Sequence, residues 1–402
     1  MEKSLKKPIN KLHPAILIIL GLFLVFSCKR EQPSPNSGTF FKTYQSDSST
    51  TGEYLEQMPD GSYMIESFYG PGRPLLTRLD KYGRLIWNKK IQLKGNDYAS
   101  DIFPLNDGSS FVLHPGSGPT IFKFDTTGKI NIPVNLPYPS NIAYGKMTYV
   151  GSNFLLASCG FYFSSNPDPV NRIYVLDVNL NLLRIDSFNN SIIGGNLFVL
   201  NVNNRSSTGD YFLSGFKIPG KGASTSKYKM FVARISATGL VKQTIIDASD
   251  RTHEDQLVAQ TNTNDSGQIL LGYRYSATIS YPVVVKIDKN LDTVWEKAFQ
   301  QNTSAIQPNS ISFCKDGGLL ILGTFQRSGL TNVQPYILKI DKDGNKQWDK
   351  TISAPGDGAF GFTYGLNLDD GGYGLVGNSN QFGNGKNGNR ILFVKTDANG
   401  NY

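Results

Sequence analysis

Two short sequence motifs alternate along this chain of 402 residues, and each occurs seven times. The first motif is an apolar run with a basic residue, a turn that begins with Asp or Ser, and a second apolar run. Its turns begin at Asp80, Asp125, Asp177, Ser236, Asp288, Asp341 and Asp397. Successive turns are 45 to 59 residues apart. A period of this length indicates an array of similar units rather than a set of unrelated domains.

The second motif lies between successive copies of the first and joins a turn to a glycine-rich apolar run. Its copies read PDGSYMIESF, NDGSSFVLHP, GSNFLLASCG, TGDYFLSGF, DSGQILLGY, DGGLLILGT and DGGYGLVGN. Asp-Gly supplies the positive φ that a tight hairpin turn requires. Each unit is therefore predicted to hold four antiparallel strands, a to d, which one unit has at 305–314, 319–324, 336–340 and 346–352. Such units at this spacing are typical of an all-β fold, the β-propeller, here with seven blades.

The two ends of the repeat region complement each other. The last unit stops at Tyr402, where its strand d is expected to begin. The segment 39–45 contains FFKTY, which resembles QWDKTI and IWNKKI in the fourth strands of other units. Pairing of 39–45 with the last blade would close the ring and remove both exposed edges. The 364 residues from 39 to 402 then give 52 for each of the seven blades.

The amino-acid composition agrees with short strands and tight turns. The chain contains 41 Gly, 24 Phe and 20 Tyr, and only 18% of its residues are charged. Coiled coils and helical arrays need more Ala, Glu, Lys and Leu. Because 39% of the residues are hydrophobic, the composition also excludes a chain that is disordered throughout.

The first 28 residues are typical of an export signal. Four Lys precede an apolar run from Ala15 to Phe26, which is too short to span a bilayer core of about 30 Å. Cys28 follows in the string VFSC, which resembles the lipobox of bacterial lipoproteins. The resemblance implies that 1–27 is a signal peptide and that Cys28 carries palmitate. It also implies attachment in the cell envelope, at the outer membrane or the cell surface. An ordinary secretory signal and a single membrane-spanning anchor are the alternatives.

Residues 28–38 are polar and contain Pro, so they are predicted to be the lipidated cysteine and a flexible tether before a propeller at 39–402. Removal of 1–27 takes away four Lys and one Glu, which leaves 36 basic and 31 acidic residues and a net charge of +5. The sequence has no Lys/Arg run of the kind that binds nucleic acid. We therefore expect a membrane as a partner, through Cys28, and no nucleic acid.

The repeat units resemble those of bacterial secreted propellers, with the pattern DGGYIL-G followed by VVKID-DGN and W-K. From residue 39 onward they are distantly similar to quinoprotein-like and delta-60 repeat propellers. The resemblance implies an architecture and very little chemistry, because one fold supports many functions. It carries no cofactor, since no set of quinone ligands can be named in this sequence.

The longest connections, between strands b and c, carry the candidate ligand-binding residues. The a–b and c–d turns are expected on one face, and the b–c and d–a loops on the other. Basic and aromatic side chains there could hold an anionic ligand or a glycan by hydrogen bonds and ring stacking. The candidates are Arg73, Tyr162, Arg172, Lys221, Tyr228, Arg274, Tyr275, Tyr281, Arg327 and Arg390. The alternative is that these loops are only solvated.

Acidic residues give a second kind of candidate site. Four of them gather in one d–a loop: Asp247, Asp250, Glu254 and Asp255. Such a cluster could bind Ca²⁺ or perform acid–base chemistry, or it could be a solvated acidic loop. The turn at Asp341 resembles a calcium loop, but it has Ile352 where a bidentate Glu is needed. We therefore expect no metal site there.

Histidine and tryptophan are interpreted as structural. His114 and His253 have no second metal ligand at a suitable spacing. Trp87, Trp295 and Trp348 occupy equivalent positions in strand d of three units, which indicates packing between units. The sequence therefore predicts no catalytic residue.

These observations favour a monomeric, non-enzymatic binding or scaffolding protein. Its partner is expected to be a glycan or a protein at the face of the b–c and d–a loops. A hydrolase or lyase that acts on polysaccharide is the first alternative. A calcium-dependent adhesion propeller is the second.

Overall fold

The computed structural model describes residues 38–44, 49–69, 73–91, 101–114, 119–131, 133–137, 144–150, 154–160, 171–188, 197–204, 210–217, 228–236, 239–246, 254–275, 280–301, 304–327, 333–352, 360–380 and 389–402. The regular elements in these ranges are β-strands. They form seven antiparallel sheets of four strands each. This described part of the chain holds no helix that could cross a membrane. Contacts between residues group 39–402 into one compact unit, and residues 1–38 are a separate unit.

The first four sheets follow one another in chain order. Sheet 1 contains β2 (Thr50–Gln57), β3 (Tyr63–Tyr69), β4 (Arg73–Leu79) and β5 (Leu85–Lys90). Sheet 2 contains β6 (Asp101–Pro104), β7 (Ser110–His114), β8 (Thr120–Phe124) and β9 (Val134–Asn135). Sheet 3 contains β10 (Tyr144–Val150), β11 (Phe154–Gly160), β12 (Asn171–Asp177) and β13 (Leu182–Phe188). Sheet 4 contains β14 (Leu197–Asn204), β15 (Tyr211–Lys217), β16 (Lys229–Ser236) and β17 (Gly239–Ile246).

The other three sheets include the one that joins the two ends of the compact unit. Sheet 5 contains β18 (Glu254–Asn262), β19 (Gln268–Tyr275), β20 (Ser280–Ile287) and β21 (Thr293–Ala298). Sheet 6 contains β22 (Ser304–Phe313), β23 (Leu319–Arg327), β24 (Val333–Ile340) and β25 (Lys346–Thr351). Sheet 7 contains β26 (Phe360–Asn367), β27 (Tyr373–Ser379), β28 (Arg390–Thr396) and β1 (Phe40–Tyr44).

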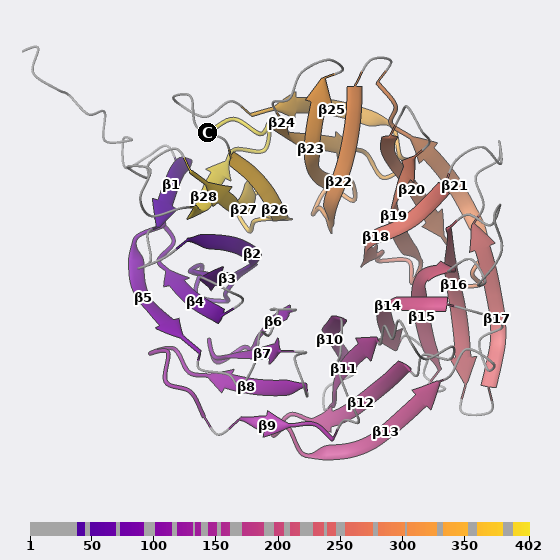
Figure 1. Cartoon of the computed structure of the whole chain (residues 1–402), viewed down its shortest axis with the longest axis horizontal. Helices are drawn as coiled ribbons and strands as arrows, with labels where there is room; N and C mark the ends of the chain where they lie inside the picture. The colour runs from indigo at the N-terminus through magenta and orange to yellow at the C-terminus, as the bar shows by residue number, and fades with distance from the viewer. Residues whose placement is uncertain are drawn as a thin grey trace, which may run out of the picture. The chain divides into compact units, whose positions relative to one another are not determined.

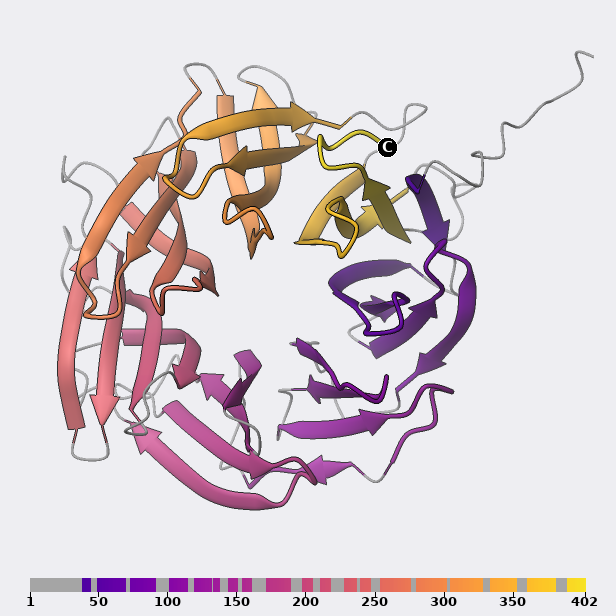
Figure 2. The ribbon, with the colours of Figure 1, turned by 180° about the vertical axis from the view of Figure 1, so that it is seen from behind.

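Within residues 39–402 the sheets are arranged around a common centre, as Figure 1 and, from behind, Figure 2 show. The first strand of each unit lies nearest that centre, and we call these seven strands the inner strands. They are β2, β6, β10, β14, β18, β22 and β26. The prediction that strand a is innermost is confirmed for these strands. Side chains on the inner strands are therefore the ones that can meet across the centre.

Strand β1 supplies the outermost strand of sheet 7. It runs antiparallel to β28, with Phe40 opposite Lys395 and Tyr44 opposite Ile391. The predicted pairing of this segment with the last unit agrees with the register for 40–44, and Gln45 lies outside the described residues.

Sheet 7 also contacts sheet 1 directly. The backbone N–H of Thr50 donates to the carbonyl of Asn389 at 2.7 Å. The Thr363 hydroxyl donates to the carbonyl of Gly52 at 2.5 Å. The two ends of the repeat region are therefore held together by hydrogen bonds as well as by packing.

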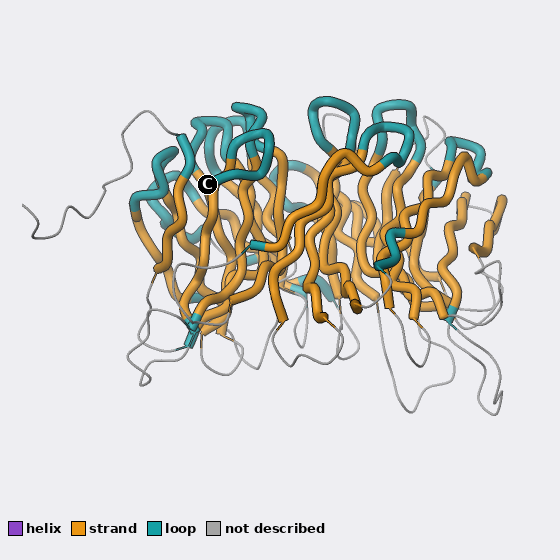
Figure 3. The backbone as a smooth tube through the Cα atoms, turned by 90° about the horizontal axis from the view of Figure 1, so that it is seen from above, coloured by secondary structure: helices purple, strands orange, loops and turns teal. Residues whose placement is uncertain are grey.

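The tight turns follow from the Asp and Gly residues that begin and end them. Asp80 accepts hydrogen bonds from the backbone N–H groups of Tyr82 and Arg84, at 2.9 and 2.8 Å. Gly83 completes the turn with a φ of +69°, which favours glycine. Many of the described turns gather at one rim, as Figure 3 shows. This rim is therefore built from short turns whose backbone N–H groups are hydrogen-bonded within the turn itself.

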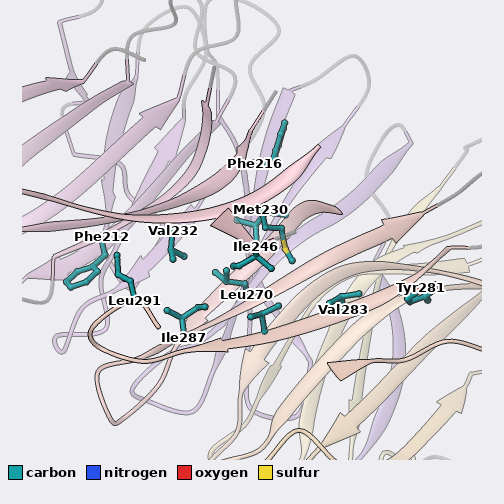
Figure 4. Packing of buried hydrophobic residues seen from close by; sticks show 12 residues of the cluster. Phe212, Phe216, Met230, Val232, Ile246, Leu270, Tyr281, Val283, Ile287 and Leu291 are labelled. Atoms are coloured by element: carbon teal, nitrogen blue, oxygen red, sulfur yellow. The ribbon is translucent and has the colours of Figure 1, made fainter. Parts of the chain in front are cut away.

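Apolar side chains fill the space between neighbouring sheets. One group lies between sheets 4 and 5 and includes Met230, Val232, Leu270 and Val283, all fully buried (Figure 4). The strands that carry them read as near-continuous apolar runs because both faces of each sheet are covered. The cores between sheets thus hold the inner strands in fixed positions.

An aromatic residue from one sheet packs on a turn glycine of the next. A Cβ atom placed on Gly128 would lie 2.9 Å from Cδ2 of Trp87, and one on Gly400 would lie 2.9 Å from Cη2 of Trp348. Trp295 meets Gly344 in the same way, at 3.1 Å. The interpretation of these three tryptophans as packing between units is confirmed. Only a glycine leaves room for the ring, and each of these three also has a positive φ.

Candidate functional site

Arg274 and Tyr281, two of the predicted loop residues, lie in the interior instead. Each is 6% exposed. The expectation that they present an exposed loop surface is wrong, because β19 continues to Tyr275 and β20 already begins at Ser280. The loop between these strands is shorter than the sequence suggested.

Arg274 belongs to a buried ion-pair network. Its Nε and Nη2 donate to the two carboxylate oxygens of Asp255, both at 2.7 Å, and Nη2 also donates to Glu296 at 2.8 Å. These carboxylates raise the pKa of Arg274 above its usual value, against the effect of burial. Asp255 is 1% exposed, so it cannot serve the acidic loop site for which it was a candidate. A bidentate pair of this kind is a structural cross-link between β18 and β19.

The remaining predicted ligand-binding residues are spread over the sheets. Arg73 is exposed at the start of β4, and four others are partly exposed, namely Arg172, Tyr228, Tyr275 and Arg390. Tyr162, Lys221 and the side chain of Arg327 lie outside the described residues. The same holds for Cys28, Asp247, Asp250 and the side chain of Glu254. Of the loop candidates, the structure brings Arg274 opposite Tyr281 and packs Tyr228 against the core group that contains Tyr281. Arg73, Arg172 and Arg390 lie on three other sheets.

The turn at Asp341 has a structural role. Asp341 accepts hydrogen bonds from the backbone N–H groups of Asp343 and Asn345, at 2.9 and 2.8 Å. Among the described residues no group of three metal-binding side chains is placed to hold an ion.

A buried Glu–His pair lies between sheets 1 and 2. Glu66 of β3 is 0% exposed and His114 of β7 is 1% exposed. Oε1 of Glu66 is 3.4 Å from Nε2 of His114. Neither oxygen of Glu66 and neither ring nitrogen of His114 has a hydrogen-bond partner among the described atoms. Buried polar groups without partners are rare, and each one calls for an explanation.

Burial disfavours the charged form of both members of this pair. It raises the pKa of Glu66 well above its usual value, and the nearby carboxyls of Asp101 and Glu53 raise it further. Burial lowers the pKa of His114 to about 3. From the sequence His114 was interpreted as structural, and Glu66 was not among the predicted site residues.

Comparison of the repeat units shows how unusual the pair is. Glu66 lies six positions after the turn residue Asp60, where sheets 5, 6 and 7 have Leu271, Leu322 and Val376. Glu66 therefore occupies a position that these three sheets fill with an aliphatic side chain, whereas sheet 4 has the buried Ser214 there. His114 likewise occupies a position that is Gly in those three sheets, at Gly272, Gly323 and Gly377. Polar residues at these strand-b positions were the signal that the sequence offered.

The inner strands β2 and β26 contribute three partly exposed residues, Glu53, Tyr54 and Tyr364. Glu53 is left out of the register between β2 and β3, where Gly52 and Tyr54 take partners and the strand shifts. Burial raises the pKa of Glu53 to about 7. The rings of Tyr54 and Tyr364 stack at 4.2 Å between centroids, with 20° between their planes. We call Glu53, Tyr54, Glu66, Asp101, His114 and Tyr364 the inner-strand cluster.

Asp101 links this cluster to sheet 3. Its Oδ2 accepts a hydrogen bond of 2.6 Å from the backbone N–H of Met147. Its charge contributes to the raised pKa values of Glu66, Tyr54 and Tyr364. The cluster therefore draws side chains from sheets 1, 2 and 7 into one electrostatically coupled group.

The comparison with solved structures concerns the fold. No protein-family model and no curated protein matches the chain. The Dos1 propeller is similar with a TM-score of 0.50 and 10% identity, over 90% of this chain and 96% of that one. The chain is a β-propeller. Its blades are four-stranded and antiparallel.

Two other solved structures are similar to this propeller. One is the polysaccharide lyase Uly1, with a TM-score of 0.53 and 9% identity over 91% of this chain and 90% of that one. The other is the Pan2 WD40 domain of Neurospora crassa, with a TM-score of 0.50 and 10% identity over 89% of this chain and 96% of that one. Identities this low show the fold and leave the function to the residues of the site.

Proposed function

We propose that this propeller is a lipoprotein of the cell envelope, attached through Cys28 to the outer membrane or the cell surface. The support is in the sequence: a basic start, a short apolar run and the string VFSC. Two or more acyl chains would make the attachment stable. Labelling with a palmitate analogue tests it, since Cys28→Ala should abolish the label, and a variant that is still labelled would contradict the proposal.

We also propose that the seven sheets act as the blades of one ring, which 40–44 closes. The hydrogen bonds between sheets 7 and 1 and the register of β1 on β28 support this. A closed ring has no free sheet edge between its first and last blades. It would hold the inner strands rigidly, as a binding site requires.

We propose that the propeller binds a glycan without transforming it. The observation that carries this function is the inner-strand cluster, in which Tyr54 and Tyr364 stack and the carboxyl group of Asp101 acts on both rings. Aromatic faces next to carboxyl groups match the apolar faces and hydroxyl groups of sugars. The partly exposed Arg172 and Arg390 would then contribute at the edge of the site.

A glycan array with the full chain, purified in detergent, tests this function. Tyr54→Ala should lose at least tenfold in affinity for the glycan that binds. The matched control is Tyr82→Ala, because Tyr82 is 50% exposed on a tight turn. Equal losses in both variants, or an array with no binder, would count against glycan binding.

An acid–base enzyme that acts on polysaccharide is the second candidate. The observation in its favour is the pKa of Glu53, about 7, which suits proton transfer near neutral pH. Incubation with polysaccharides would release reducing ends if the chain is a hydrolase, and would also create absorbing double bonds if it is a lyase. Either product must disappear in Glu53→Gln, and its persistence would exclude this role for Glu53.

A further inference from the structure

We propose that the inner-strand cluster binds a ligand that carries a protonated amine, such as an amino sugar. The inference deepens the proposed function and rests on it, because it names the chemical class of the glycan. It differs from the sequence analysis, in which basic loop residues suggested an anionic ligand.

The first support is the charge of the cluster. Its carboxyl groups come from three strands: Glu53 from β2, Glu66 from β3 and Asp101 from β6. The groups that act on Glu66, besides burial, are the other two carboxyls. Glu56, also on β2, acts on Tyr54 and Tyr364. The deprotonated forms of Glu53 and Asp101 would repel an anionic ligand here, whereas a cation would supply the opposite charge.

The second support is the Glu66–His114 pair. Both side chains are more than nine-tenths buried, and their polar atoms lack hydrogen-bond partners among the described atoms. Sheets 5, 6 and 7 fill the same positions with aliphatic residues and glycine, so packing does not require the pair. Since unsatisfied buried groups destabilise a fold, a bound partner explains their presence better than the fold does.

The third support concerns the kind of cation. The described residues hold no group of three side chains that is arranged for a metal ion. An ammonium group is less demanding, because it offers three rotatable donors on a compact charge. The stacked rings of Tyr54 and Tyr364 add faces that attract both cations and sugars. An amine on a sugar combines these properties in one ligand.

The ligand would approach from the centre of the propeller. Glu53, Tyr54 and Tyr364 belong to the inner strands and are partly exposed, whereas Glu66 of β3 and His114 of β7 are buried. The amine would pair with Glu53, the partly exposed carboxyl group of the cluster. Binding is therefore expected to depend on pH through Glu53, Glu66, Asp101, Glu56 and His114, with Tyr54 and Tyr364 as the other titratable neighbours.

Calorimetry with the full chain in detergent tests the proposal. The two probes are a β-1,4-linked glucosamine oligosaccharide and its N-acetylated counterpart, which differ in the charge of the amine. We expect the glucosamine probe to bind at least tenfold more tightly at pH 7. Its affinity should increase severalfold from pH 5.5 to 7, because Glu53 loses its proton over this range.

Two variants, Glu53→Gln and Glu66→Gln, and one control test which carboxyl groups hold the amine. Glu53→Gln should lower the affinity for the glucosamine probe at least tenfold and remove the pH dependence. Asp343→Asn makes the same change of charge on an exposed turn and should have no effect. Glu66→Gln, which keeps the size of the side chain, should weaken binding as well. A circular dichroism spectrum that matches the unmodified chain shows that each variant is folded.

The outcomes distinguish a failure of the amine proposal from a failure of the proposed glycan binding. If the N-acetylated probe binds as tightly as the glucosamine probe, the inference is wrong and glycan binding stands. If neither probe binds but the array yields another glycan, the inference is wrong in the same way. If glucosamine binds and Glu53→Gln leaves the affinity unchanged, the amine is held elsewhere and the proposed site is overturned.

Discussion

The ring of Phe40 lies against Gly83, so that a Cβ atom on the glycine would come within 2.7 Å of Cζ of the ring. Phe40 belongs to sheet 7 and Gly83 to a turn of sheet 1. Trp87 and Gly128 have the same relationship between sheets 1 and 2. An N-terminal residue thus takes the packing role that a strand-d tryptophan has elsewhere, which ties the two ends of the repeat region to each other.

Substitution of Gly83 is expected to weaken this contact. Gly83→Ala introduces a Cβ atom beside Phe40 at a φ of +69°, and should lower the free energy of unfolding by about 2–4 kcal/mol. Gly61→Ala is the control, because Gly61 has a φ of +77° but no atom within 4 Å of the added Cβ. It should cost only about 1 kcal/mol. Urea denaturation measures both, and equal losses would show that the contact with Phe40 adds nothing.

Replacement of Glu66 by leucine is expected to stabilise the propeller at neutral and alkaline pH. The pKa of Glu66 is raised in the folded state, so its stabilising contribution is complete below the usual value of 4.5. That contribution is lost as the pH rises through the folded pKa, at about 1.4 kcal/mol for each pH unit in this window. Glu66→Leu, which copies Leu271 and Leu322, should remove this loss.

Urea denaturation at pH 5 and pH 8 compares the two proteins. The advantage of Glu66→Leu should be larger at pH 8 than at pH 5. If the difference in the free energy of unfolding between the variant and the unmodified chain is the same at pH 5 and pH 8, Glu66 titrates normally in the folded state.

His114 is expected to destabilise the protein in acid. Its pKa falls from 6.5 to about 3 on folding, so the unfolded chain binds a proton first as the pH drops. Stability is therefore complete above pH 6.5 and is lost toward pH 3, again at about 1.4 kcal/mol per pH unit at most. His114→Ser, which copies Ser67 of sheet 1, should flatten this limb of the stability profile. The NMR signal that disappears in His114→Ser belongs to His114, and its titration near pH 6.5 in the folded protein would refute the explanation.

The ion pair of Arg274 and Asp255 gives a prediction about the interior. Asp255→Asn leaves the buried guanidinium with only Glu296 as a charged partner, and should cost about 3–5 kcal/mol. The double variant Asp255→Leu with Arg274→Met removes both charges and should recover most of this loss. Thermal unfolding compares the three proteins. If the double variant is less stable than Asp255→Asn, the ion pair contributes more free energy to folding than the burial of its two charges costs.

The architecture could be predicted from the sequence because it repeats. Asp-Gly turns and apolar runs fix a hairpin locally, and each unit supplies an independent instance of the same pattern. The placement of FFKTY beside the last unit was visible for the same reason, since it resembles the strand that this unit lacks.

The site could not be predicted in the same way. Arg274 looked like a loop residue because the strand boundary depends on a pairing with Asp255 that is distant in sequence. Glu66 and His114 come from different sheets, and nothing in either motif shows that they meet. Their signal is a departure from the repeat at two strand positions, which becomes informative only when the units are compared position by position.

The position of β1 also has a mechanical consequence. Thr39 leads directly into Phe40, so any pull on the start of this unit enters the propeller at the strand that pairs with β28. That load would reach the Phe40–Lys395 pair first and would be shared with sheet 1 through the contact at Gly83. The resistance of the propeller to traction at this end would then depend on a five-residue strand and one aromatic ring.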